Sequence, residues 1–263
     1  MIIIDFHTHI FPDDLAERAI TKLTSYSPET RNYTDGTAGG LLDSMKKNGI
    51  SHSVLLSIAT KPSQVHIINQ TAQTLQSQQF TPFGTLHPDM ENAVEEIEFL
   101  KKSAIKGVKF HPEYQDFYIT DPKLFPIYEQ LEAEGFIVQF HAGKDPGPFS
   151  CDHALPADLR KIHKQFPKMT IIAAHLGGWG LWDDVEKELC GLPIFFDTSA
   201  TAHYIDPVQC KRIIQKHGVE HILFGSDSPW FDQGDALRWI MQLPLTNHDI
   251  ECILGKNALN VLA

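Results

Sequence analysis

The stretch IIIDFHTHIFP, residues 2–12, joins an apolar, β-branched run to three titratable side chains, Asp5, His7 and His9. Short runs of this composition favour a β-strand. Since side chains two apart along a strand point to the same face, His7 and His9 would offer two imidazoles to one ion. The stretch therefore predicts a strand whose end carries metal ligands.

Seven more short apolar runs follow, so the chain contains eight. They are SHSVLLSI (51–58), FTPFGTLH (80–87), IKGVKFH (105–111), GFIVQFH (135–141), MTIIAAH (169–175), LPIFFDTS (192–199) and EHILFGSD (220–227). Stretches with helical spacing and helix-capping residues lie between the runs, at 91–103, 122–135, 156–166, 206–218 and 235–243.

Strand and helix thus alternate along nearly the whole chain. The runs do not alternate regularly between apolar and polar residues. Such runs are typical of parallel strands that are covered by helices on both faces. Eight such units predict an α/β fold, a (β/α)8 TIM barrel, over residues 1–263 as a single domain. A doubly wound open sheet is the alternative, but the first run is not followed by a G-x-G-x-x-G turn.

The longest segment without a strand covers residues 11–40. Two interpretations remain open for this segment: a lid over the barrel mouth, or an ordinary surface loop that contains a helix.

The charge balance limits the class of ligand. The chain has 22 Lys and Arg against 33 Asp and Glu, a formal net charge of −11. This balance repels phosphate backbones and anionic membranes, so we expect a small-molecule substrate and neither nucleic acid nor a membrane as partner. The start of the chain lacks a signal-peptide pattern and no run approaches the ~20 apolar residues that span a bilayer, which predicts a soluble, cytoplasmic protein. The four cysteines form no C-x-x-C pair and indicate no thiolate zinc site.

Histidines stand at or near the ends of five of the eight runs, and Asp227 ends the eighth. The carboxyl ends of barrel strands meet at one mouth, where barrel enzymes have their active sites. His141 and Asp227 would join His7 and His9 there. Three nitrogens and one oxygen suit Zn²⁺ or another divalent ion, with a position left for water whose pKa the ion lowers toward neutrality. The residues alone also allow His175 as a fourth imidazole ligand.

Six motifs extend over the chain: IDFHTH, VKFHPEYQ, QFHAG, AAHLGGWG, LFGSDSPW and ILGKNALNVL. Together they resemble the amidohydrolase superfamily, in particular the amidohydrolase-related branch that includes aminocarboxymuconate-semialdehyde decarboxylase. The resemblance implies that the metal ligands are His7, His9, His141 and Asp227. It also implies that Asp227 accepts the proton of the water, and that His175 lies beside the metal to hydrogen-bond or transfer protons.

The fourth strand decides how many metal ions to expect. Binuclear members carry a carbamylated lysine or a glutamate there, and Lys109 stands near that place. We expect instead one Zn²⁺ per chain, with Lys109 as a cation that holds a substrate carboxylate or closes an ion pair. His111 and Trp179 are expected to line the substrate site; a capped loop histidine and a tryptophan packed under the helices are their alternatives. Asp5 is expected one layer below His7, orienting a ligand histidine.

The leading function is hydrolysis of a small amide, lactone or ester by metal-activated water. The alternative is non-oxidative decarboxylation of a small unsaturated or aromatic acid at the same site. TatD-type nucleases and polymerase-and-histidinol-phosphatase phosphoesterases open with a similar motif, but the first expect a glutamate on the fourth strand and the second more ligands than this chain supplies. A purely structural metal is disfavoured because structural zinc sites are closed. Related barrels often pair, so the sequence is compatible with a homodimer to which the apolar stretch 178–185 contributes.

Overall fold

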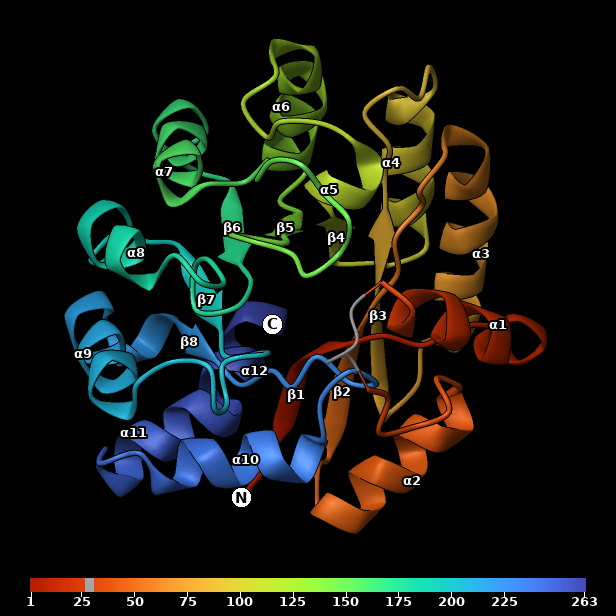
Figure 1. Ribbon diagram of the computed structural model, residues 1–263. Helices are drawn as coiled ribbons and strands as arrows, with labels where there is room; N and C mark the ends of the chain where they lie inside the picture. The colour runs from red at the N-terminus through yellow and green to blue at the C-terminus, as the bar shows by residue number, and fades with distance from the viewer. Residues whose placement is uncertain (27–30) are drawn as a thin grey trace.

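A computed structural model describes residues 1–26 and 31–263, and its core is one sheet of eight parallel strands in the order β1 to β8 (Figure 1). The strands are β1 Ile4–Thr8, β2 His52–Leu56, β3 Phe80–Thr85, β4 Gly107–Phe110, β5 Ile137–Phe140, β6 Thr170–Ala173, β7 Phe195–Asp197 and β8 Ile222–Leu223. Each predicted apolar run contains one of them.

Hydrogen bonds between β1 and the residues that follow β8 close the sheet into a barrel. The backbone N–H of Phe6 donates to the carbonyl of Phe224 at 2.7 Å, and that of Asp227 donates to the carbonyl of His7 at 2.8 Å. The N–H of His9 donates to the carbonyl of Ser228 at 2.7 Å. The predicted (β/α)8 barrel is confirmed.

Helices surround the barrel. They are α1 Asp13–Thr24, α2 Ala38–Asn48, α3 Val65–Leu75, α4 Ala93–Lys102, α5 Pro112–Gln115, α6 Phe125–Ala133, α7 Pro156–Gln165, α8 Trp182–Glu188, α9 Pro207–His217, α10 Gln233–Gln242, α11 Asn247–Glu251 and α12 Asn257–Leu262. Short turns of other helix types are η1 Pro62–Gln64, η2 Pro122–Leu124, η3 Val219–His221 and the π-helical η4 Cys252–Lys256. Four of the five stretches with helical spacing contain a helix, and the fifth, 235–243, overlaps α10, which begins two residues earlier. In the described part of the chain, no helix combines the length and apolar composition of a membrane span.

Two apolar clusters form the core. The larger one joins the strands to the surrounding helices, whereas the smaller one joins strand residues to one another and to Ala258 of α12. Phe6 and Phe83 belong to the smaller cluster, with ring centroids 5.8 Å apart. Gly107 leaves room for the Phe83 ring, since a Cβ at this position would lie 2.4 Å from it. The barrel interior is therefore packed at this level, and a site must lie nearer the strand ends.

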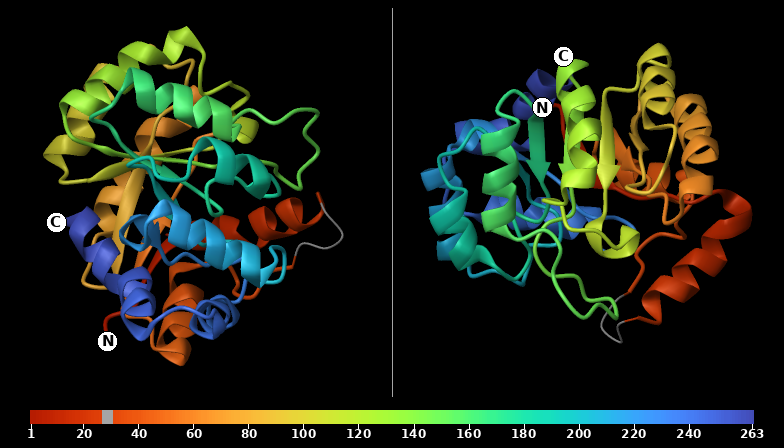
Figure 2. Two further views of the ribbon diagram at one scale, coloured as in Figure 1. Left: turned by 90° about the vertical axis from the view of Figure 1, so that its left-hand side faces the viewer. Right: turned by 90° about the horizontal axis from the view of Figure 1, so that it is seen from above.

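The carboxyl ends of the strands and α1 lie at one end of the molecule, and both chain termini lie at the other (Figure 2, right). The segment 11–40 contains α1 and the start of α2, and residues 27–30 within it lie outside the described residues. Its role as a lid stays a prediction.

Candidate metal centre

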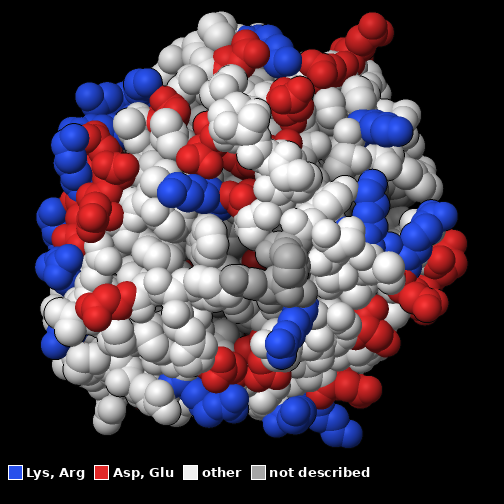
Figure 3. All heavy atoms as spheres, in the orientation of Figure 1, with Lys and Arg blue, Asp and Glu red and all other residues white. Residues whose placement is uncertain are grey.

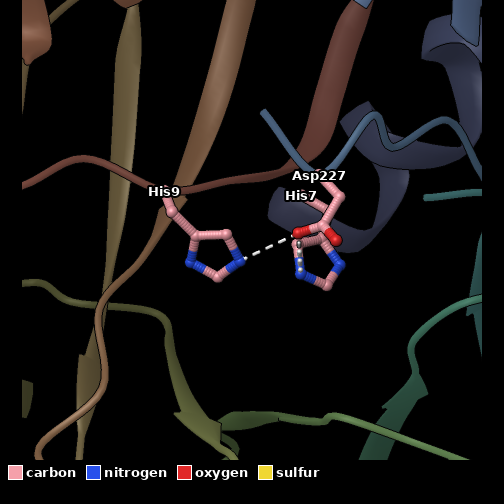
Figure 4. Close-up of side chains that lie close together, drawn as sticks. All are labelled: His7, His9 and Asp227. Atoms are coloured by element: carbon pink, nitrogen blue, oxygen red, sulfur yellow. Dashed lines mark ion pairs between the residues drawn. The ribbon is translucent and has the colours of Figure 1, made fainter. Parts of the chain in front are cut away.

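His7, His9 and Asp227 lie together at the mouth of the barrel, where β1 and β8 end (Figure 4). The Nε2 atom of His9 lies 3.1 Å from Oδ1 of Asp227, and Nε2 of His7 lies 3.5 Å from the same oxygen. His7 is buried, while His9 and Asp227 are partly accessible. The structure thus brings together three of the four predicted ligands.

The hydrogen bonds of the two histidines determine which ring nitrogen carries the proton. Nδ1 of His9 lies 2.6 Å from the carbonyl oxygen of Leu56, which can only accept. Nδ1 of His7 lies 2.9 Å from the carboxylate of Asp197. In their neutral forms both rings therefore donate through Nδ1 and present an unprotonated Nε2 to Asp227.

His141 and His175 repeat this arrangement on the opposite side of His7. Nε2 of His141 lies 3.2 Å from the carbonyl of Lys144, and Nδ1 of His175 lies 3.2 Å from the carbonyl of Ser199. The inner nitrogens, Nδ1 of His141 and Nε2 of His175, lie 3.0 Å apart. The ring centroids of His7 and His175 are 5.1 Å apart.

A divalent cation fits this set of donors. In each neutral imidazole, one ring nitrogen donates to a carbonyl or carboxylate outside the group, and the other carries a lone pair that points into the group. These lone pairs repel one another and the Asp227 carboxylate unless a positive charge lies between them. His141 is not within the compact group of His7, His9 and Asp227, because its inner nitrogen faces His175. Ligation by His141, and the choice between ligand and proton carrier for His175, stay predictions.

Burial and charge keep these groups in the states that a metal needs. Burial is the main cause that lowers the pKa of His7 to about 3, and the nearby Lys109 acts in the same direction. Burial also lowers the pKa values of His141 and His175. For Asp227, burial opposes ionisation, but His7 and the other histidines outweigh it and lower the pKa to about 2. The imidazoles of His7, His141 and His175 are thus neutral and the Asp227 carboxylate is charged at neutral pH.

Asp197, at the end of β7, is a site residue that the sequence analysis missed. Its Oδ2 accepts from His7 and, at 2.8 Å, from Nε2 of Gln139. Its Oδ1 accepts from the backbone N–H groups of His175 at 3.2 Å and Ser199 at 3.0 Å. The Ser199 hydroxyl also bonds to Asp197 and lies 2.9 Å from Nδ1 of both His7 and His175. The sequence did contain a clue to this residue: Asp197 ends the apolar part of the run LPIFFDTS, and Asp227 follows its own run in the same way.

That Asp5 orients a ligand histidine stays a prediction. Its carboxylate accepts from the backbone N–H and the hydroxyl of Ser226 at 2.9 and 2.6 Å, and from Gln233 of α10 at 2.8 Å. It contacts His7 only through the backbone N–H, at 3.2 Å, among the described residues. The pairing of β1 with β2 shifts register between Asp5 and Thr8, and the Asp5 carboxylate bonds to Ser226 and to Gln233 of α10.

Lys109 on β4 is a buried cation without a hydrogen-bond acceptor. Its side chain is 0% exposed, and no acceptor within the described ranges lies within hydrogen-bonding distance of its Nζ. Burial lowers its pKa to about 8, against the opposing charges of Asp197 and Asp227. Lys109 therefore stays mostly charged at neutral pH and faces the same cavity as the histidines.

His111 and Trp179 both line that cavity, as predicted from their places after β4 and β6. The ring of His111 stacks on His141 with centroids 4.1 Å apart, and its Nε2 lies 3.5 Å from Asp145. The indole N–H of Trp179 donates to the carbonyl of Ala200 at 3.1 Å. Contact of either residue with a substrate stays a prediction.

The cavity has a volume of about 590 Å³ and opens at the mouth of the barrel. Besides the residues above, it is lined by aliphatic and aromatic side chains of α1, α3 and the loops after β1, β2, β7 and β8. The face that Figure 3 shows is hollowed near its centre, and mostly uncharged residues surround the hollow. A largely apolar cavity with a few convergent polar groups is the usual form of a small-molecule site.

Comparison with known proteins places the chain in a family. A family model described as Amidohydrolase matches residues 4–263. The fold is similar to that of 5-carboxyvanillate decarboxylase from Sphingomonas paucimobilis, with a TM-score of 0.73 at 13% identity, covering 99% of this chain and 98% of that one. It is also similar to 2,6-dihydroxybenzoate decarboxylase solved with 2,6-dihydroxybenzoate, with a TM-score of 0.74 at 14% identity and coverages of 100% and 99%.

A third similar structure is a dihydroxybenzoic acid decarboxylase from Polaromonas with bound manganese and the inhibitor 2-nitroresorcinol. Its TM-score is 0.75 at 16% identity, with 99% of this chain and 96% of that chain covered. Among functionally curated proteins, none matches the sequence significantly.

Proposed function

The chain belongs to the amidohydrolase family, and from this premise we propose that it is a metal-dependent decarboxylase of a carboxylic acid. The reaction replaces the carboxylate of the substrate by hydrogen: R–COO⁻ and H⁺ give R–H and CO₂. The observation that carries the proposal is Lys109, a buried ammonium group whose Nζ has no acceptor among the described residues and which lines the cavity beside His7 and Asp227. A substrate carboxylate would supply the missing acceptor.

The decarboxylases among similar structures add support. The three similar structures described above all bear decarboxylase names, and one of them was solved with bound manganese. They share less than 25% identity with this chain, so they support the proposal through the fold and do not identify the substrate. They favour decarboxylation over hydrolysis, the function that the sequence analysis placed first.

His7, His9 and Asp227 would hold one divalent ion, Zn²⁺ or Mn²⁺, with His141 as a further ligand. When bound, such an ion polarises a substrate oxygen and neutralises its charge. Asp197 holds Nδ1 of His7, so that the opposite nitrogen, Nε2, is directed at Asp227 and would be free to bind an ion. We assign proton transfer to His175: its unprotonated Nε2, which is directed into the site, would take up one proton from solvent and deliver it to the carbon that loses CO₂.

Hydrolysis is the second candidate, because Asp227 is also suited to accept a proton from water. Its pKa of about 2 keeps it ionised at neutral pH. The same residues would then serve a substrate with a scissile amide, lactone or ester bond.

The experiment that separates the two candidates follows the products. The protein, loaded with one equivalent of Mn²⁺ or Zn²⁺, is incubated in D₂O with a panel of aromatic and unsaturated acids and, in parallel, with their esters and lactones. We expect CO₂ release and one deuterium at the carbon that carried the carboxylate. Cleavage of an ester or lactone without CO₂ would establish hydrolysis in place of decarboxylation.

Two variants test the assigned residues. Asp227→Asn should abolish CO₂ release while the circular dichroism spectrum stays unchanged. Lys109→Met should raise KM for the acid at least tenfold, whereas the same change at the exposed cavity residue Lys144 should alter KM by less than about threefold. Equal effects of the two lysine variants would contradict the role of Lys109.

A further inference from the structure

One wall of the cavity, between α1 and α3, consists of aliphatic side chains. We call it the apolar arm and define it by Leu15 and Leu23 of α1, Ile58 after β2, and Ile67 and Ile68 of α3. The two helices lie side by side in both Figure 1 and the right-hand view of Figure 2. No part of the mechanism proposed above uses these residues.

Two side chains of the apolar arm are exposed to solvent. Ile67 is 60% exposed and Leu15 is 38% exposed, although both line a cavity. Aliphatic surface that faces water inside a cavity is surface from which a ligand can exclude water, and each buried methylene strengthens binding by up to about fourfold. The exposed surface of Ile67 and Leu15 therefore favours an apolar ligand.

Three polar residues of the cavity lining, in α3 and the segment before it, carry no charge. They are Thr60 of the loop after β2, Gln64 of η1 and Thr71 of α3. The Gln64 carbonyl oxygen is already occupied, since it accepts from the backbone N–H groups of Thr60 at 2.9 Å and Lys61 at 3.1 Å. A charged portion of a ligand would find no partner among these three side chains; the lysine, arginine and aspartate residues of the cavity lining are Lys109, Lys144, Asp145, Asp227 and, in the segment after α1, Arg31.

The size of the cavity exceeds what one ring needs. A cavity of about 150 Å³ accommodates a benzene ring, whereas this cavity measures about 590 Å³. A single-ring acid beside Lys109 would leave most of the volume, including the apolar arm, filled with water.

We propose that the substrate is a carboxylic acid with an extended apolar portion, an alkyl chain or a second ring, and that this portion binds in the apolar arm while the carboxylate lies at Lys109. The assignment of the carboxylate rests on the function proposed above. The assignment of the apolar portion rests on the exposure, charge and volume of the cavity wall.

The test measures binding without turnover. Butyrate, hexanoate, octanoate and decanoate are titrated into the Mn²⁺-loaded protein by calorimetry, and into the metal-free protein in parallel. In both series we expect the affinity to rise about two- to fourfold for each added methylene. Octanamide, which lacks the charge, should bind at least tenfold more weakly than octanoate.

Ile67→Asp is the variant that tests the apolar arm. Because Ile67 is largely exposed, the substitution leaves the core intact. It should weaken decanoate binding at least tenfold and butyrate binding less than about twofold. The matched control is Val208→Asp on α9, an equally exposed aliphatic residue, 66%, that does not line the cavity, and it should leave both affinities unchanged.

The two proposals fail in different ways. An affinity that is independent of chain length, or an equal loss for butyrate and decanoate in Ile67→Asp, would overturn the apolar arm as a substrate site even if CO₂ is released from smaller acids. Tight, chain-length-dependent binding without CO₂ release from any acid would contradict decarboxylation and leave the apolar arm supported.

Discussion

At the scale of single residues, the site depends on where each histidine places its proton. His9, His141 and His175 donate their outer nitrogens to backbone carbonyl groups, and His7 donates to the Asp197 carboxylate. The inner nitrogens are left as acceptors without any ion being present. Such fixed tautomers lower the reorganisation that metal binding requires.

Asp197 should therefore contribute strongly to metal affinity. Asp197→Asn removes the charge that holds the His7 proton on Nδ1 and should weaken Mn²⁺ binding about 10- to 100-fold, measured by competition with a chelating dye. The control is Asp184→Asn at an exposed position of α8, which should not change the affinity. Unaltered affinity in Asp197→Asn would show that the carboxylate serves the fold alone.

The buried charge of Lys109 should lower the free energy of unfolding of the protein. Burial lowers its pKa from 10.5 to about 8, so below pH 8 the folded state bears the full penalty of the buried charge, and the penalty disappears as the pH rises to 10.5. Lys109→Met should raise the free energy of unfolding of the metal-free protein by the order of 1–3 kcal/mol at pH 7. Urea denaturation at pH 7 and pH 10 tests this; a gain that is the same at both pH values would contradict the cause.

At the scale of elements, the residues of the candidate site lie at the ends of strands. One irregular strand, β1, affects which side chains point into the site. The shift of register in β1 turns Asp5 toward Ser226 and α10, while His7 stays in the cavity. Asp5 then joins β1 to the segment that carries Asp227. A bulge of this kind re-aims side chains next to active sites.

A buried histidine between β7 and α9 makes the stability of this region depend on pH. The ring of His217 stacks on Phe196 with centroids 3.7 Å apart, and its Nε2 donates to the carbonyl of Ile194 at 2.6 Å. Burial lowers its pKa from 6.5 to about 4. Its stabilising contribution is thus complete above pH 6.5 and is lost as the pH falls toward 4, when the unfolded chain binds the proton first.

We expect this residue to account for a loss of the order of 3 kcal/mol in the free energy of unfolding between pH 6.5 and pH 4. In His217→Gln the dependence on pH should be weaker by that amount, as measured by urea denaturation across the range. His248→Gln, at an exposed position of α11, should retain the full slope. The interpretation does not hold if the two variants show the same slope.

At the scale of the whole molecule, the barrel brings together donors that lie more than 200 residues apart in the chain. The hydrogen bonds that join the end of β8 to β1 also set Asp227 beside His7. Metal binding at this junction would therefore link the two ends of the sheet, and its free energy would add to that of folding.

Removal of metal should lower the thermal stability of the protein. At a free Mn²⁺ concentration 100 times the dissociation constant, the folded state gains about 2.7 kcal/mol, which for a chain of this size raises the melting temperature by a few degrees. Differential scanning calorimetry with and without a chelator measures the difference. Asp227→Asn should show little or none of the shift, and a full shift in this variant would place the ion elsewhere.

The sequence by itself determined the barrel and the identity of the metal-binding candidates. Eight apolar runs in alternation with helical stretches leave few other ways to bury both faces of every strand. A histidine or aspartate that follows such a run must lie at the mouth, because all parallel strands end there. These inferences use only the local period and the position of a residue relative to its strand.

Only the tertiary structure decided how the candidates meet. The role of Asp197 depends on a ring 190 residues away, and the side-chain partners of Asp5 lie 221 and 228 residues away. The isolation of Lys109 and the width of the cavity likewise arise from the packing of distant elements. Distances between side chains, burial and the resulting proton positions are properties of the closed barrel, since none of them exists until the strand ends have been brought together.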